Sequence, residues 1–425
     1  MTTARLSLAF VLPLALLAFA NSCKDQPPTT PTPEPQRAIA LSLADSSLRE
    51  IWLRLSLPDS LAGRTVKLFR NDALLCQITL ARRDTVVMDS GLALGASYAY
   101  RAIRYDGARA LDSANLATAT MPATSHAFAW RIDTLGTTAT RLNDVCVIND
   151  TCIWVVGYFG DQYNAARFDG HQWQYKRIEW TYQGQTGISE LKSIFAFSQN
   201  DIWVGDSAPY HWDGVQWTVF NVTGLFDGYI QKFWGTSSRD LYAVGTNGAI
   251  MHYNGLAWRR VESGTTATIN DVWGSIDRAL GDMLALAPTG RTLTQEPRQI
   301  LRIKGLLVDS IAWTPNFWVQ SVWFRNPYLL WAGGGGFWHR RLSGAWQALP
   351  VTGGYVESVR GRAENDIFVV GHFGIVWHFN GETWQRYSEL TSSIRYKSVA
   401  VGDRRMCAVG VQNGRGYVLQ MFRAQ

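Results

Sequence analysis

The chain reads NDIWVG at residues 200–205 and DGVQW at residues 213–217, and both phrases recur downstream of residue 126. The first has the form Asp-Ile/Leu-aromatic-Ala/Val-Val-Gly and returns at 240–245 and 366–371, with looser copies elsewhere. The second has the form Asp/Asn-Gly-x-x-Trp and returns at 169–173, 254–258 and 380–384, with a short form at 343–346. Self-similarity at a nearly fixed period predicts a repeat architecture.

Each repeat has room for four short strands between one closing tryptophan and the next. The spacing of these tryptophans ranges from 33 to 55 residues along the series Trp130, Trp173, Trp217, Trp258, Trp313, Trp346 and Trp384. Four strands in a period of this length are typical of a β-propeller blade. We therefore expect a seven-bladed β-propeller over residues 126–425, with a long insertion in the fourth blade.

The two ends of the repeat region complement each other. Residues 394–422 supply three strands and then stop, whereas residues 128–133 (FAWRID) form a lone strand before the first full repeat. The following GTTAT at 136–140 recurs unchanged at 264–268, which places the lone strand at the end of a unit. We expect this N-terminal strand to complete the last blade, which closes the ring and removes an open sheet edge.

Residues 38–122 alternate apolar and polar positions in short runs that turn residues interrupt. About seven strands in this length predict a β-sandwich. The stretch LALGASY at 92–98 resembles the fibronectin type III pattern, with a leucine six residues before a corner tyrosine, Tyr98. Trp52 stands where that family buries a tryptophan, and the family's usual proline is replaced by Leu94. The resemblance implies a spacer or adhesive module.

Composition agrees with an all-β protein and excludes other classes. The 425 residues include 38 Gly and 19 Trp, and only 17% are charged against 47% hydrophobic, which excludes a disordered chain. The net charge of +6 comes without any run of five basic residues, so we expect no nucleic-acid partner.

Residues 1–22 indicate an export signal, with Arg5 before a short apolar stretch that contains Pro13. The following Ala20-Asn21-Ser22-Cys23 resembles the lipobox of bacterial lipoproteins, which implies lipidation of Cys23 and a membrane anchor. The alternative is an ordinary signal peptide cut near Ser22. Lys24-Asp25 resembles the surface-export signal of Bacteroidetes lipoproteins, and residues 23–37 form a proline-rich tether. We therefore expect a lipid-anchored protein of the cell envelope, at the outer membrane and exposed on its surface.

The repeat also resembles the Trp-rich propeller repeats of bacterial secreted lipoproteins, a likeness that is specific for fold and not for activity. Because the tryptophans share one register, we expect them to pack blade on blade. Aromatics in the insertions are the better contact candidates, since loops carry function more often than blades. These are Trp180, Tyr182, Phe226, Tyr229, Phe317 and Trp318.

Two further residue sets invite a chemical interpretation. Four repeats have a histidine just before the turn between their third and fourth strands, namely His211, His252, His339 and His378. Equivalent positions of different blades lie too far apart to share one ion, so we expect these histidines to form hydrogen bonds to the turn and not to bind a metal. Cys146 and Cys152 flank an expected hairpin, and a disulfide between them would suit an oxidising compartment. No cofactor-binding or nucleophile motif is present in the sequence.

The sequence therefore favours a membrane-anchored binding or scaffold protein whose propeller binds a cell-envelope protein or a glycan. The alternative is a carbohydrate-active enzyme, a glycoside hydrolase or lyase, with its site in the central pocket. A purely structural role is the third. The repeat places small or apolar residues at the expected axis, from which Lys232, Arg360 and Arg362 depart. If these line the pocket, an anionic ligand is favoured; the acids Glu190, Glu296 and Glu357 lie off the repeat register and stay unranked.

Overall fold

The computed structural model describes residues 39–57, 65–160, 162–182, 184–277, 282–288, 299–341, 344–350 and 354–423. The predicted export signal, Cys23 and the proline-rich tether lie outside these residues. Nearly all regular structure is antiparallel β-sheet, apart from three single-turn 3₁₀ helices, η1 (Thr246–Gly248), η2 (His372–Gly374) and η3 (Ser388–Leu390). Within the described residues, no helix has the length and apolarity needed to cross a membrane.

The N-terminal part is a β-sandwich of two sheets. One sheet has the order β1 (Ala40–Ser46), β2 (Glu50–Ser56) and β5 (Asp84–Ser90). The other has the order β4 (Ala73–Thr79), β3 (Thr65–Arg70), β6 (Ser97–Asp106) and β7 (Arg109–Ala119). Alternate apolar residues of both sheets, such as Leu53 and Leu68, form one buried core. The Tyr98 hydroxyl accepts a hydrogen bond from the Ala93 amide at 2.8 Å, which fixes the turn before β6.

Seven four-stranded sheets follow, each numbered here in chain order and given with its strands from first to last. Sheet 1 has β9 (Arg141–Asn149), β10 (Cys152–Tyr158), β11 (Ala165–Phe168) and β12 (Trp173–Lys176); sheet 2 has β15 (Ser193–Ser198), β16 (Asp201–Gly205), β17 (Pro209–Trp212) and β18 (Trp217–Val219); sheet 3 has β19 (Ile230–Ser237), β20 (Asp240–Gly245), β21 (Ile250–Tyr253) and β22 (Trp258–Val261); sheet 4 has β23 (Trp273–Asp277), β24 (Asp282–Pro288), β25 (Gln299–Lys304) and β26 (Leu307–Ala312).

The remaining sheets continue the same order. Sheet 5 has β27 (Val319–Trp323), β28 (Leu329–Gly334), β29 (Phe337–Arg341) and β30 (Gln347–Ala348); sheet 6 has β31 (Val356–Ala363), β32 (Asp366–Gly371), β33 (Val376–Phe379) and β34 (Trp384–Arg386); sheet 7 has β35 (Arg395–Val401), β36 (Arg405–Gln412), β37 (Arg415–Arg423) and β8 (Phe128–Leu135). A two-stranded hairpin, β13 (Trp180–Tyr182) and β14 (Gln185–Gly187), stands between sheets 1 and 2.

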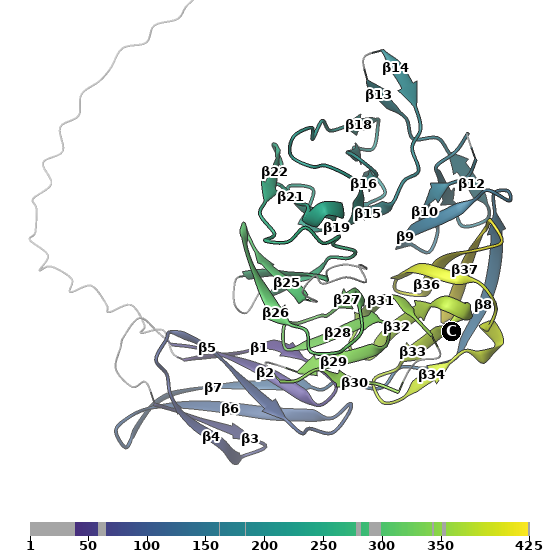
Figure 1. The fold of residues 1–425 in the computed structure, drawn as a ribbon. Helices are drawn as coiled ribbons and strands as arrows, with labels where there is room; N and C mark the ends of the chain where they lie inside the picture. Colours follow the sequence, from purple (N-terminus) through teal and green to yellow (C-terminus); the bar gives the residue numbers. More distant parts are fainter. Residues whose placement is uncertain are drawn as a thin grey trace, which may run out of the picture.

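The sheets form a ring with their first strands innermost (Figure 1). Contacts join β9, β15, β19, β23, β27, β31 and β35 in sequence and return from β35 to β9. As the sequence predicts, β8 pairs with β37, from Leu135 opposite Gly416 to Phe128 opposite Arg423. The N-terminal strand of the ring therefore completes the C-terminal sheet.

The turns between the third and fourth strands explain the Asp/Asn-Gly-x-x-Trp phrase. The side-chain oxygen of Asp213 accepts hydrogen bonds from the Val215 and Gln216 amides, both at 2.8 Å, and Gly214 has φ 96°. This is an Asx turn, in which the glycine supplies a conformation that other residues rarely adopt. The tryptophans that follow pack against the preceding sheet; Trp258, for example, lies edge-on to Trp203 at 5.7 Å.

The sandwich lies against sheets 5 and 6 (Figure 1). Arg325 forms an ion pair with Asp45 at 3.1 Å, and Arg341 pairs with Glu50. Trp52 is buried, as the sequence predicts, but its indole stacks on Tyr328 of the ring at 5.7 Å and lies outside the sandwich core cluster.

Candidate functional site

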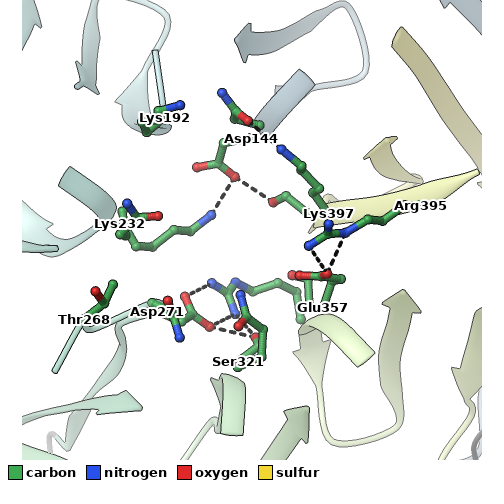
Figure 2. A pocket seen from close by; sticks show the side chains of 16 residues that line it. Asp144, Lys192, Lys232, Thr268, Asp271, Ser321, Glu357, Arg395 and Lys397 are labelled. Carbon is green, nitrogen blue, oxygen red and sulfur yellow. Dashed lines mark hydrogen bonds and ion pairs between the residues drawn. The ribbon is translucent and has the colours of Figure 1, made fainter. Parts of the chain in front are cut away.

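A polar pocket of about 380 Å³ lies where the first strands of the sheets meet (Figure 2). Five basic and three acidic side chains line it, an excess of two positive charges when all are ionised. The full lining consists of Asn143, Asp144, Lys192, Gln231, Lys232, Thr268, Asn270, Asp271, Gln320, Ser321, Glu357, Ser358, Arg360, Arg395, Lys397 and Ser398.

The repeat itself generates this lining. In each sheet a buried apolar residue, such as Val145, Val322 or Val399, lies in the first strand or directly before it, and the two residues that precede it are polar in all seven sheets. The outer positions are Asn143, Lys192, Gln231, Asn270, Gln320, Glu357 and Lys397, and the inner ones are Asp144, Ser193, Lys232, Asp271, Ser321, Ser358 and Ser398. All of them line the pocket except the buried Ser193. Two polar rings therefore surround the axis, one residue apart.

Asp144 is neutralised by a cation from another sheet. The Lys232 ammonium lies 2.6 Å from its Oδ1, and the Ser398 hydroxyl donates to the same oxygen at 2.6 Å. The Ile194 amide donates to Oδ2 at 2.9 Å. Because these three donors come from three other sheets, this buried carboxylate ties sheets 1, 2, 3 and 7 together across the axis.

Asp271 is neutralised by a cation of another sheet, as Asp144 is; here the cation is Arg360. The guanidinium donates to both carboxylate oxygens, at 2.9 and 2.5 Å, and the Ser321 hydroxyl donates at 2.7 Å. Arg360 is 5% exposed and also lies over the Trp273 ring at 4.8 Å. Such two-point pairing is specific to the arginine fork. This pair forms the wall of the pocket on the side of sheets 4 to 6.

The third acid, Glu357, receives two basic groups. Its Oε1 accepts from Arg395 Nε at 2.8 Å and lies 2.8 Å from His372 Nε2. Figure 2 shows Arg395 reaching over Glu357 towards the centre of the pocket. The three carboxylates of the lining are thus all engaged by cations of the protein.

Lys397 and Lys192 occupy the remaining edge. The Lys397 ammonium donates to Asn143 Oδ1 at 2.9 Å, and among the described residues no carboxylate lies within ion-pair distance of it. Partial burial, with repulsion from Arg395, lowers the pKa of Lys397 to about 8. Lys192 pairs with Glu190 at 2.8 Å. Although burial opposes it, hydrogen bonds from Asn143, Lys192 and Arg141 lower the pKa of Glu190 to about 2.

Solved structures resemble the ring, although no family model and no curated protein sequence matches the chain. YCF48 bound to the D1 peptide aligns with a TM-score of 0.54 and 17% identity, over 70% of this chain and 95% of that one. The WD40 propeller domain of Doa1 aligns with a TM-score of 0.52 and 11% identity, over 70% of this chain and 98% of that one. The ring of sheets is a β-propeller.

The structure brings two of the three predicted basic residues into the propeller's pocket. Lys232 and Arg360 line it, whereas Arg362, whose side chain is 45% exposed, lies outside the lining and pairs with Asp366 and Asp403, both at 3.4 Å. Residues two apart on a regular strand point to the same face, so Arg362 would be expected to share the face of Arg360. A shift in the β31–β32 register between Gly361 and Ala363 interrupts this alternation at Arg362. The pocket also contains Lys192, Arg395 and Lys397, which were not predicted from the sequence. An alignment of the seven repeats on the buried apolar residue of the first strand would have found Lys192 and Lys397, because both precede that residue by two positions.

The aromatic candidates divide between surface and core. Phe317 and Tyr229 are each 54% exposed beside the first strands, and Phe373 in η2 is 61% exposed. Phe226 is buried in the core of sheet 3, contrary to expectation. Trp180 packs over Gly187 of its own hairpin, and Trp318 is half-buried near Tyr355. Tyr182 ends β13, and its side chain is outside the described set.

The two cysteines of sheet 1 do not pair. Cys146 and Cys152 are free thiols, because the register sets Cys146 opposite Trp154 and Cys152 opposite Asn149. Burial raises the pKa of the Cys146 thiol to about 12, so it is a poor nucleophile at neutral pH. The disulfide prediction is therefore corrected to two thiols packed in the core between sheets 1 and 2.

The recurrent histidines have a structural role inside the blades. His211 and His252 bond to Asp201 and Asp240, at 2.9 and 2.7 Å, and His378 bonds in the same way to Asp366. The partner is thus the aspartate that begins the second strand and not the turn that the sequence suggested. In the part of the chain that the structure describes, no three His, Cys, Asp or Glu side chains gather as a metal site requires.

Proposed function

We propose that the chain is a lipid-anchored binding protein of the bacterial cell envelope. Its seven-bladed propeller binds a segment of a partner protein, and a fibronectin type III-like domain and a proline-rich tether hold the propeller away from the membrane. The observation that carries the proposal is the polar pocket on the face where exposed aromatic side chains also gather.

The pocket and the aromatic residues share one face for a topological reason. The polar rings lie at the beginning of the first strands, so the loops that enter these strands and those between second and third strands border the pocket. Phe317 and Tyr229 lie in loops of the first kind, and Phe373 lies in a loop of the second kind. Exposed aromatics around a concave polar centre suit a protein partner. One structural neighbour is itself a propeller bound to a peptide.

The chemistry of the pocket favours binding over glycoside hydrolysis. A pair of catalytic carboxylates needs one group free to attack or to accept a proton and another that holds a proton. Asp144 and Asp271 instead form buried ion pairs, and Glu357 is engaged by Arg395 and His372. The groups that the protein leaves available are ammonium donors, which bind ligands and do not cleave glycosides by themselves.

The experiment is crosslinking of the tagged chain in its own cells, followed by capture and mass spectrometry. We expect one dominant partner in near-equal amount. Replacing Phe317 and Phe373 with alanine should abolish capture. Replacing Val215 and Leu256, which are 83% and 89% exposed on the turns of the opposite face, should leave it intact. No protein at any crosslinker length would contradict the proposal and would favour a glycan ligand.

The anchor is tested separately. A Cys23→Ser variant should lose incorporation of a labelled fatty acid and should leave the membrane fraction, because lipid attachment needs the thiol. Retention of the label in this variant would refute lipidation at Cys23. The binding proposal would then stand without the anchor.

A further inference from the structure

The charges of the pocket are not balanced within it. Asp144 and Asp271 are each satisfied by one cation and by hydroxyl and amide donors, so neither attracts a further positive group. Glu357 is already shared between Arg395 and His372. The uncompensated positive charge is therefore that of Lys397, which lies in sheet 7 between Asp144 of sheet 1 and Glu357 of sheet 6 (Figure 2).

Lys397 retains donors for a ligand. An ammonium group has three N–H donors, and the structure assigns one of them, to Asn143 Oδ1. Lys192 and Arg395 contribute positive potential at Lys397, whereas Glu190 and Glu357 contribute negative potential. Glu190 and Glu357 each have closer cationic partners, Lys192 at 2.8 Å and Arg395 at 2.5 Å. The ammonium of Lys397 is consequently half-buried without a direct counter-ion in the described residues.

We propose that Lys397, with Lys192 and Arg395 beside it, forms a subsite that binds one carboxylate of the partner protein. This inference rests on the proposed function, since it names the group that the propeller recognises. The carboxylate comes from an aspartate or glutamate side chain or from the C-terminus of the partner.

A carboxylate fits better than a more highly charged anion. The pocket of about 380 Å³ accommodates one side chain or chain end, at the small end of ligand sites. Four of the five basic side chains of the lining already pair with a carboxylate of the protein, so among the described residues one positive charge, that of Lys397, is left for a ligand, and a monoanion matches it. The aromatic side chains at the border supply apolar contacts to the residues that flank the carboxylate.

Binding must then be linked to protonation of Lys397. Burial and neighbouring cations disfavour its charged form and set its pKa near 8, whereas a bound carboxylate favours the charged form and raises that pKa. Affinity for a carboxylate is therefore level from about pH 5, above which the ligand is ionised, to about pH 8, and it falls at higher pH by up to about tenfold per pH unit until the pKa of the complex is reached. A neutral ligand would show no such slope.

The test is NMR of the full chain with ¹³C-labelled lysine side chains, in which Lys397 and Lys192 are assigned from the Lys397→Met and Lys192→Met variants. The probes are N-acetylglutamate amide, its neutral match N-acetylglutamine amide, a blocked alanine with a free C-terminal carboxylate, and inorganic phosphate. We expect the two carboxylate probes to shift both lysine signals saturably and to raise the pKa of Lys397. The relative affinities of these two probes distinguish a side chain from a chain end.

Three results would overturn the subsite: equal shifts with the glutamine probe, tighter binding of phosphate than of either carboxylate, or unchanged carboxylate affinity in Lys397→Met. A Lys304→Met variant, outside the pocket, is the matched control. The outcomes for the proposed function can be told apart from those for the subsite. If wild type and Lys397→Met capture the same partner equally, the subsite is wrong and protein binding stands. If no partner is captured, the NMR titration still decides whether a carboxylate binds.

Discussion

At the scale of single residues, Arg360 and Arg362 offer a direct contrast between a buried and a surface ion pair. Arg360 is 5% exposed and neutralises Asp271, whereas Arg362 is 45% exposed and pairs at 3.4 Å with the exposed Asp403 and with the buried Asp366, which Arg423 also neutralises. Removing one partner of a buried pair leaves an uncompensated charge in the interior, at a cost of about 3–5 kcal/mol. An exposed pair contributes less than about 1 kcal/mol.

We therefore expect Arg360→Met to lower the free energy of unfolding by about 3 kcal/mol or more. Arg362→Met should change it by less than about 1 kcal/mol, because its pair with Asp403 is exposed and Arg423 and His378 still engage Asp366. Urea denaturation of both variants at pH 7 measures the difference. Similar losses in the two variants would mean that the Asp271 pair does not hold sheets 4 to 6 together.

At the scale of the structural element, the turns η1 and η2 are the same turn with different residues. The central residue has a left-handed conformation in both, with φ 57° at Asn247 and φ 59° at Phe373. Asparagine tolerates this conformation, whereas for most residues it costs about 1–2 kcal/mol. Phe373 is 61% exposed and so recovers little of that cost by burial. Strain of this kind is often retained at binding sites.

Exchange of the two residues should have opposite effects on stability. Phe373→Asn should raise the free energy of unfolding by about 1 kcal/mol, and Asn247→Phe should lower it by at least as much. Asn247→Phe also removes the hydrogen bond from Asn247 to the Asp227 carbonyl. Phe373→Asn should in addition weaken capture of the partner. Denaturation together with the crosslinking assay checks both, and a destabilised Phe373→Asn would contradict the strain argument.

The turns and strands could be predicted from the sequence where the same residue type has the same structural role in every repeat. The Asx turns, the packing tryptophans and the closure by β8 follow from phrases that recur because every sheet needs them. The pocket was only partly predictable, since its positions share polarity but not residue type. Small or apolar residues were expected at the axis, whereas the pocket is lined there by polar positions such as Asn270 and Asp271. Pairs such as Asp144 with Lys232 join residues 88 apart, which no local pattern indicates.

At the scale of the whole molecule, the contact between sandwich and propeller contains a buried acid. Glu364, in the turn between β31 and β32, is 1% exposed, and Asn326 donates to its Oε1 at 3.0 Å. Burial and repulsion from Asp45 raise its pKa to about 7, against attraction by Arg325 and Arg341. The folded protein therefore holds Glu364 in its neutral form more readily than the unfolded chain does. This makes the attachment of the two domains dependent on pH.

The sign of the effect follows from linkage. Below about pH 4.5 the carboxyl is protonated in both states and costs nothing, and as the pH rises to about 7 the folded state must increasingly hold a buried charge. The Glu364 contribution to stability should thus fall between about pH 4.5 and 7, by on the order of 3 kcal/mol, and stay level above. Glu364→Gln, which keeps the shape and the hydrogen bond to Asn326 in an uncharged form, should remove this slope.

Urea denaturation of wild type and Glu364→Gln at pH 5, 6, 7 and 8 measures the slope as the difference in unfolding free energy between the two proteins. The control is Glu262→Gln, because the Glu262 side chain is 80% exposed. The same slope in wild type and Glu364→Gln would show that other groups carry the pH dependence. Its loss only in Glu364→Gln would place the titrating group at the contact between the sandwich and the propeller.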